Sequence, residues 1–146
     1  SKMQTQSPPE YSSIIIKLTE ELNQAILDCN LKRYNELTSP NITCFEPEGD
    51  GQLITGIKFH EFYFKGWAAQ KVKEDNKVRT NLSILNPFVK MLADNKAAVI
   101  AYIKIIQYFD ETENTFKSVS WEETRVWNLE DGKWVHVHFH RSFCRK

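Results

Sequence analysis

The sequence predicts a single α+β domain in which helices come first and a curved antiparallel sheet follows. Three observations predict this fold class. Apolar residues recur at helical spacing early in the chain, four long strand-like segments fill its second half, and 146 residues is the usual size of one domain. Helices followed by an antiparallel meander should cover one face of the sheet.

The first helix should begin at Ser7-Pro8-Pro9-Glu10. Ser7 can cap it, Pro8 falls at the first helical position, and Glu10 lies three residues after the cap. The helix should end near Cys29 and Asn30. The apolar residues at helical spacing behind this start are Tyr11, Ile14, Ile15, Leu18, Leu22, Ala25 and Ile26.

Shorter elements should follow. We expect a second helix over residues 31–37, stopped by Ser39 and Pro40, and a third over residues 57–70. Two short strands, residues 42–45 and 52–55, should flank a turn at Gly49-Asp50-Gly51, and residues 72–78 form a charged loop. The long strands should span residues 78–92, 97–109, 116–129 and 134–144, separated by turn sequences.

The strand at residues 97–109 is apolar on both faces, whereas antiparallel strands usually alternate apolar with polar residues. Helices can cover only one face, so a partner subunit is the simplest cover for the other. The alternative is a core that is two-sided within one monomer. The expected oligomer contacts are Val99, Ala101, Ile103, Ile105 and Phe109.

Composition excludes several classes of protein. Lys plus Arg equals Asp plus Glu at 19 each, so no global field attracts nucleic acid or acidic membranes. No apolar run reaches the length of a membrane span, and the polar start lacks the core of a signal peptide. Three scattered cysteines fit reduced thiols and a cytoplasmic location. We interpret residues 1–9 as a linker remnant and 10–146 as the domain.

Three cations occupy strand positions where the pattern calls for apolar residues: Lys104, Arg125 and Arg141. A half-buried cation needs a counter-charge or a ligand. If these faces converge, they line an apolar pocket suited to a carboxylate or another small anion. Internal pairing is the alternative, because Glu123 shares a strand face with Arg125. Both interpretations remain open.

Simple alternation places His136, His138 and His140 on one strand face. Structural zinc usually needs four ligands, and no further ligand of obvious spacing joins them. We therefore expect solvent-facing or interface histidines, no metal and no cofactor. No catalytic motif is present, and Arg125 would keep Glu123 ionised and weakly basic. That argues against an enzyme.

A series of motifs, in order along the chain, resembles one known module: the association, or hub, domain of calcium/calmodulin-dependent protein kinase type II. The similarity runs from about Glu10 to Phe143. The motifs are Phe45-Glu46-Pro47-Glu48, Phe59-His60-Glu61-Phe62-Tyr63-Phe64, Ile84-Leu85-Asn86-Pro87, Ala101-Tyr102-Ile103-Lys104, Glu122-Glu123-Thr124-Arg125-Val126-Trp127, Asp131-Gly132-Lys133-Trp134 and Val137-His138-Phe139-His140-Arg141.

The resemblance implies the cone-shaped fold of the nuclear transport factor two-like superfamily, with the curved sheet wrapped around a long N-terminal helix. It implies dimers stacked into a closed double ring, a dodecamer or tetradecamer, in a parent kinase that binds calmodulin. The family's cavity arginines correspond to Arg125 and Arg141, and its cavity histidine to His60. Lys104 replaces a third arginine, and the aromatic loop after the third helix is altered, with Trp67 followed by two alanines.

The sequence therefore predicts a non-catalytic oligomerisation domain whose cavity binds small carboxylates or a regulatory-segment peptide. The expected cavity residues are Arg125, Arg141, Lys104, His60, Glu123 and Trp67. Two alternatives remain: a stand-alone enzyme of the same superfamily, of the isomerase or dehydratase type, and a ligand-binding module with no kinase in its parent chain.

Overall fold

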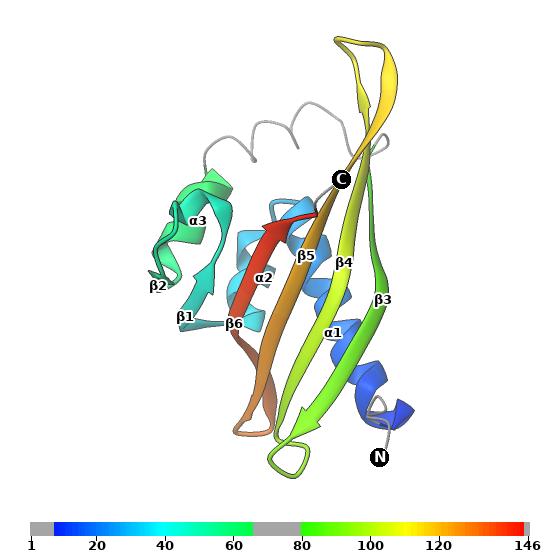
Figure 1. Cartoon of the computed structure of the whole chain (residues 1–146). Helices are drawn as coiled ribbons and strands as arrows, with labels where there is room; N and C mark the ends of the chain where they lie inside the picture. Colours follow the sequence, from blue (N-terminus) through cyan, green and yellow to red (C-terminus); the bar gives the residue numbers. More distant parts are fainter. Residues whose placement is uncertain (1–7, 66–79, 145–146) are drawn as a thin grey trace.

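The structure, a computed structural model, describes residues 8–65 and 80–144 (Figure 1). Within these residues, three helices and six strands follow one another in the predicted order, with a 3-10 turn at Pro47–Gly49. The helices are α1 (Pro9–Leu27), α2 (Leu31–Leu37) and α3 (Lys58–Lys65). The strands are β1 (Thr38–Phe45), β2 (Ile54–Thr55), β3 (Thr80–Leu92), β4 (Ala97–Asp110), β5 (Thr115–Glu130) and β6 (Lys133–Phe143).

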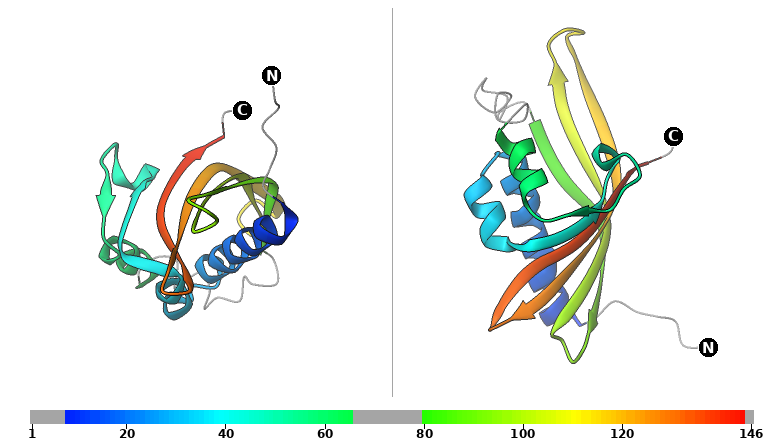
Figure 2. Two further views of the ribbon diagram at one scale, coloured as in Figure 1. Left: turned by 90° about the horizontal axis from the view of Figure 1, so that it is seen from below. Right: turned by 90° about the vertical axis from the view of Figure 1, so that its left-hand side faces the viewer.

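The six strands form one sheet in the order β2-β1-β6-β5-β4-β3. Strands β3 to β6 make the expected antiparallel meander, and the sheet curves around α1 (Figure 2), so the predicted fold class is confirmed. One pair of strands departs from the antiparallel pattern, because β1 lies parallel to β6. Two parallel neighbours need a long connection between them, and here the connection is the whole segment from the end of β1 to the start of β6.

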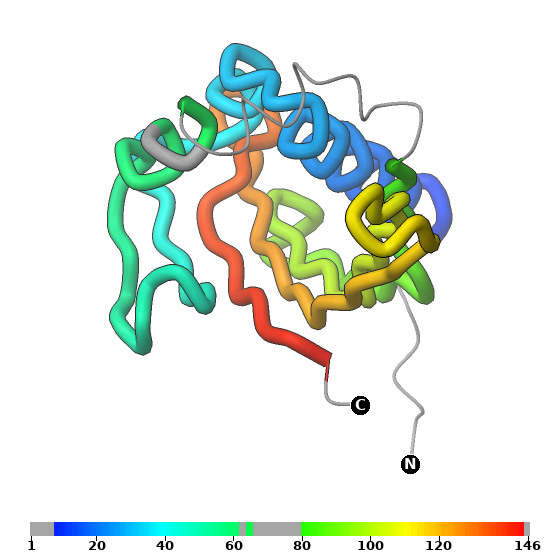
Figure 3. The backbone as a smooth tube through the Cα atoms, turned by 90° about the horizontal axis from the view of Figure 1, so that it is seen from above, coloured from blue at the N-terminus to red at the C-terminus, as the bar shows by residue number. Residues whose placement is uncertain are grey.

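Helix α1 packs into the concave side of the sheet (Figure 3). It begins at Pro9 with Pro8 as its N-cap, one residue later than predicted, and Ser7 lies outside the described residues. Its buried face is also rotated from the prediction, because Tyr11 and Ile14 are 37% and 46% exposed. The residues that α1 buries include three polar ones among the apolar set: Ser12, Ile15, Thr19, Leu22, Asn23 and Ala25.

Helix α2 has its predicted bounds, but two short strands depart from theirs. Strand β1 starts at Thr38, directly after the helix and four residues before the predicted start, so Pro40 lies inside the strand. Strand β2 keeps only two of its four predicted residues. The predicted end of the third helix, the charged loop and Trp67 lie outside the described residues.

The two faces of β4 have different surroundings. Ala98, Ile100, Tyr102 and Lys104 point inward and are buried against the helices, whereas Ala101 on the other face is exposed. The remaining predicted oligomer contacts on that outward face are half-buried. Within the described residues, no helix is long and apolar enough to cross a membrane.

A β-bulge in β6 overturns the predicted histidine face. Trp127 pairs with His136 and Val126 with His138, so Val137 is an extra residue in the ladder. A bulge reverses which side of the strand the following residues face. His136 and Phe139 are consequently both buried, whereas His140 is exposed. The expectation that three histidines share one face is wrong, and so is the expectation that His136 faces solvent.

Candidate functional site

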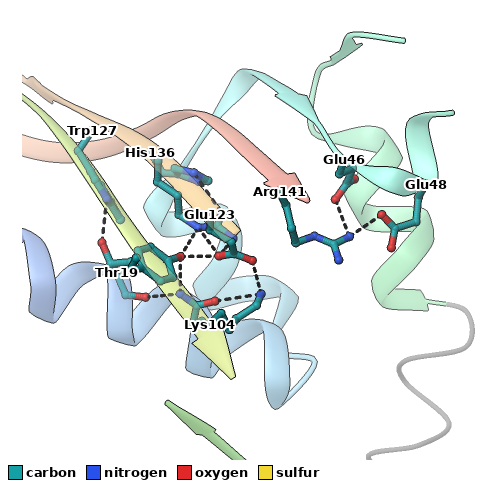
Figure 4. A network of polar contacts seen from close by, with 11 residues as sticks. Thr19, Glu46, Glu48, Lys104, Glu123, Trp127, His136 and Arg141 are labelled. Carbon is teal, nitrogen blue, oxygen red and sulfur yellow. Dashed lines mark hydrogen bonds and ion pairs between the residues drawn. The ribbon is translucent and has the colours of Figure 1, made fainter. Parts of the chain in front are cut away.

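The inner face of the sheet holds a buried cluster of charges (Figure 4). Neighbouring strands bring Lys104 of β4 and Arg125 of β5 onto one carboxylate, Glu123. The Lys104 Nζ lies 2.6 Å from Glu123 Oε2, and Arg125 Nη2 donates to Glu123 Oε1 over 3.0 Å. All three residues are at least 95% buried. Pairing is what makes these charges tolerable in an apolar interior.

Electrostatics fixes the protonation of this cluster. Burial alone would raise the pKa of Glu123, but the Arg125 guanidinium and the Lys104 ammonium outweigh it and hold the pKa at about 2. Burial lowers the pKa of Lys104 to about 8, and Glu123 opposes that effect only in part. At neutral pH the cluster therefore carries two positive charges and one negative charge.

Helix α1 and Tyr102 complete the cluster. The Tyr102 hydroxyl donates to Glu123 Oε1 over 2.5 Å and accepts from Arg125 Nε over 2.8 Å. Asn23 on α1 donates to the same hydroxyl over 3.0 Å, and its amide oxygen accepts from Lys104 over 3.3 Å. One turn earlier, the Trp127 indole donates to Thr19 over 3.1 Å. These bonds join the helix to the sheet through polar groups.

His136 is the innermost imidazole of β6 and is fully buried. Its Nε2 lies 3.2 Å from Arg125 Nη1. Because arginine can only donate, Nε2 accepts and the ring proton sits on Nδ1. Burial and the neighbouring Arg125 hold the pKa of His136 well below its ordinary value of 6.5, so the ring is neutral.

Arg141 belongs to a second cluster nearer the surface. It donates to Glu46 Oε2 over 3.1 Å and to Glu48, both from the segment that follows β1. Its guanidinium also lies 4.2 Å above the Trp121 ring, and its side chain is 11% exposed. The acidic turn Glu46-Pro47-Glu48 thus supplies the counter-charge of Arg141. His60 on α3 is buried beside Glu46, at 3.5 Å.

The predicted cavity residues therefore fall into two groups. Lys104, Glu123 and Arg125 are in direct contact, whereas Arg141 and His60 share Glu46 as a neighbour. The internal pairing of Arg125 with Glu123 is observed. The sequence analysis did not identify the neutral side chains that hydrogen-bond to the first group or lie beside it. Two of them could have been found, because Thr19 and Asn23 lie on the same helical face as the apolar Ile15 and Leu22. The members missed are Thr19, Asn23, Tyr102 and His136.

The fold is a curved sheet around a helix, with charged residues on the inner face of the sheet. A nuclear transport factor 2-like superfamily protein from Salmonella enterica shares this fold at TM-score 0.66 and 15% identity, over 94% of this chain and 93% of that protein. More specifically, residues 12–144 match the family model described as the calcium/calmodulin dependent protein kinase II association domain. The chain belongs to that family.

Individual relatives agree. The chain is 43% identical over 132 residues to the Drosophila melanogaster calcium/calmodulin-dependent protein kinase type II alpha chain, covering 90% of this chain. The solved association domain of the C. elegans kinase II matches at TM-score 0.81 and 36% identity, over 93% of this chain and 98% of its own. The chain spans only 24% of the length of the Drosophila kinase. It therefore corresponds to a part of these kinases that is not the kinase domain.

Because two buried cations share the carboxylate of Glu123, we expect that replacing this one side chain strongly lowers the free energy of unfolding. Glu123→Gln keeps the size of the side chain but leaves Lys104 and Arg125 without their counter-charge. Removing one partner of a buried ion pair costs about 3–5 kcal/mol, so the free energy of unfolding should fall by that amount. Urea unfolding at one fixed protein concentration measures it.

Glu130→Gln is the matched control, because Glu130 is an exposed carboxylate at the end of β5, away from the buried cluster. That change should alter the free energy of unfolding by less than about 0.5 kcal/mol. Equal losses in the two variants would contradict a structural role for the buried pair.

Because His136 is buried in its neutral form, we expect the folded protein to lose stability as the pH is lowered. Its folded-state pKa lies below the ordinary 6.5, so the unfolded chain binds the proton more readily and stability falls as pH drops through that value. His136→Gln should flatten the decline in unfolding free energy between about pH 7.5 and 5.5. The exposed His140→Gln serves as control and should keep the wild-type slope. Identical slopes in all three proteins would disprove the assignment.

Proposed function

We propose that this chain is the assembly module of a calcium/calmodulin-dependent protein kinase II. Copies pair through the outward face of the sheet, and the pairs close into a double ring of twelve or fourteen chains that displays kinase domains. Family membership supports the assembly role, since the matching model is that of an association domain. Calmodulin binding by the parent protein and a cytoplasmic location belong to the same proposal.

The observation that carries this proposal is the apolar outward face of β3 and β4. Register places Leu85 beside Ile103 and Phe88 beside Ala101. Leu85 and Phe88 are 41% and 43% exposed. Phe88, Ala101 and Ile103 form the apolar side of a groove of about 540 Å³, whose other side carries polar residues of β5 and β6. Monomeric proteins rarely leave a contiguous apolar patch of this kind open to water. A second copy of the chain would cover it.

The pairing of Glu123 counts against the alternative of an isomerase or dehydratase. General acid–base catalysis by a carboxylate near neutral pH needs a pKa raised by desolvation. Glu123 is desolvated, yet its two cationic neighbours hold its pKa at about 2. It is a structural counter-charge and a very weak base.

Assembly is testable by native mass spectrometry at micromolar protein. The wild type should give even-numbered species well above a dimer. Ile103→Asp, which places a charge at the centre of the outward face, should shift the population to monomers or small species because the charge is desolvated on contact. Lys133→Asp, in the exposed turn between β5 and β6, should assemble as the wild type does.

A monomeric wild type across that range would overturn the assembly proposal. Unchanged assembly of Ile103→Asp, with its near-ultraviolet circular dichroism intact, would show that the contact surface lies elsewhere.

We further propose that the inner face binds a small carboxylate or a peptide segment of the parent kinase. Two observations support this. The buried cluster carries one positive charge in excess. Arg141, which lies opposite Glu123 in the ladder between β5 and β6, keeps a side chain that is 11% exposed. An incoming carboxylate would exchange with Glu46 or Glu48 at Arg141 and gain charge-assisted hydrogen bonds.

Calorimetric titration of acetate and succinate tests the ligand proposal. Each charge-assisted bond to Arg141 contributes about 1.5–3 kcal/mol, so Arg141→Ala should weaken binding about a hundredfold. Lys104→Arg should tighten it by a smaller factor, because a guanidinium recognises carboxylates in bidentate fashion. Equal binding by wild type and Arg141→Ala, or no binding by either at millimolar ligand while both stay assembled, would refute the proposal.

A further inference from the structure

Three metal-binding side chains of different types converge between β1 and α3. Cys44 ends the buried part of β1, Glu46 follows that strand, and His60 lies on α3. The Cys44 Sγ is 3.5 Å from His60 Nε2, and the same nitrogen is 3.5 Å from Glu46 Oε1. All three ligand atoms lie within 4.8 Å of one another. Cys44 is fully buried and His60 is 6% exposed.

One imidazole nitrogen, His60 Nε2, faces both other side chains. A normal N–H···O bond spans about 2.7–3.2 Å, so 3.5 Å between His60 Nε2 and Glu46 Oε1 is long. The 3.5 Å between His60 Nε2 and Cys44 Sγ is acceptable for a hydrogen bond to sulfur. Hydrogen bonding therefore accounts for the contact with Cys44 but not for the approach of Glu46 to the same nitrogen.

The same separations suit coordination. Zinc binds cysteine sulfur at about 2.3 Å and histidine nitrogen or carboxylate oxygen at about 2.0–2.2 Å, in tetrahedral geometry. Those lengths place the sulfur about 3.6 Å from the nitrogen and the nitrogen about 3.4 Å from the oxygen. The observed distances are both 3.5 Å. We propose that Cys44, Glu46 and His60 bind one zinc ion, with a water or small ligand as the fourth donor.

The donor set selects the class of metal. A thiolate with an imidazole favours zinc or another borderline transition metal, whereas calcium and magnesium prefer oxygen donors only. Burial raises the pKa of the Cys44 thiol to about 12, so an incoming cation must displace the thiol proton. Zinc binding should therefore release protons and weaken as the pH is lowered.

Charge balance around the site favours a divalent cation. Glu46, Glu48 and Arg141 together carry one net negative charge. The thiolate formed on binding adds a second, and the zinc ion neutralises both. Although Arg141 is a cation near the metal, it contacts Glu46 through Oε2 and leaves Oε1 turned toward His60. This arrangement is the outer-shell support that orients metal ligands.

Aromatic rings hold the imidazole in place. Tyr34, Phe59 and Phe139 surround His60, with ring centroids 5.8, 5.9 and 5.5 Å from its own. A rigid apolar shell limits the reorganisation needed for binding and restricts solvent access to the metal. The proposal revises the expectation of no metal, which rested on the β6 histidines. Cys44, Glu46 and His60 form no recognisable sequence motif, and only the fold brings them together.

The test uses the tag-free assembled protein, stripped with a chelator and titrated with cobalt chloride and, separately, zinc chloride. Wild type should bind one metal per chain. Bound cobalt should give the near-ultraviolet charge-transfer absorption of a cobalt–thiolate bond. Cys44→Ala should abolish that absorption and weaken zinc binding about a hundredfold or more, since even outer-shell changes cost 10–100-fold. Glu46→Gln should weaken zinc binding but keep the thiolate absorption.

Cys144→Ser is the matched control, because Cys144 is a half-buried cysteine after β6 and outside the site. It should bind both metals as the wild type does. Native mass spectrometry of every variant separates loss of metal from loss of assembly. Absence of cobalt–thiolate absorption in the wild type, or equal zinc affinity in the wild type and Cys44→Ala, would overturn the proposal and leave a thiol–imidazole hydrogen bond.

Discussion

The two cations on the inner face of the sheet depend on one carboxylate, Glu123. Arg125 and Lys104 come from adjacent strands and would each be very unfavourable in the interior without a counter-charge. Because Glu123 is in contact with both, the register between β4 and β5 is fixed by charge as well as by apolar packing. Tyr102 and Asn23 extend the same constraint to α1. The position of the helix in the sheet therefore depends on this pairing.

The two faces of the sheet make different kinds of contact. On the concave face, alternate residues of β4 and β5 meet α1 and satisfy one another through buried hydrogen bonds. On the outward face, the intervening residues of β4 form an apolar strip beside the mostly polar residues of β5, and no element among the described residues covers it. A fold of this class can thus vary its inner polar groups and its outer contact surface separately. Here the outer surface is the one that we propose mediates assembly.

Much of the fold could be predicted, because the long strands alternate clearly and the turns between them carry strong turn residues. Lys104, Glu123 and Arg125 could be placed on one face for the same reason. The orientation of α1 was predicted less well. Its true buried face includes Thr19 and Asn23, whereas periodicity favoured the apolar Ile14. Polar residues that are buried by hydrogen bonding to distant partners are not distinguishable from surface residues by hydropathy alone.

The bulge at Val137 has a consequence for how β6 works. Without it, strict alternation would turn His138 and His140 inward together with His136, and Arg141 would face solvent, away from Glu46. The inserted residue divides the strand into two segments of opposite phase. The first segment supplies a neutral ring to the buried Arg125, and the second supplies a cation to the acidic turn after β1. Deleting Val137 would therefore leave both segments on their present sides of the sheet, whereas a change that kept Val137 but straightened the ladder would exchange the inner and outer surfaces of half the strand.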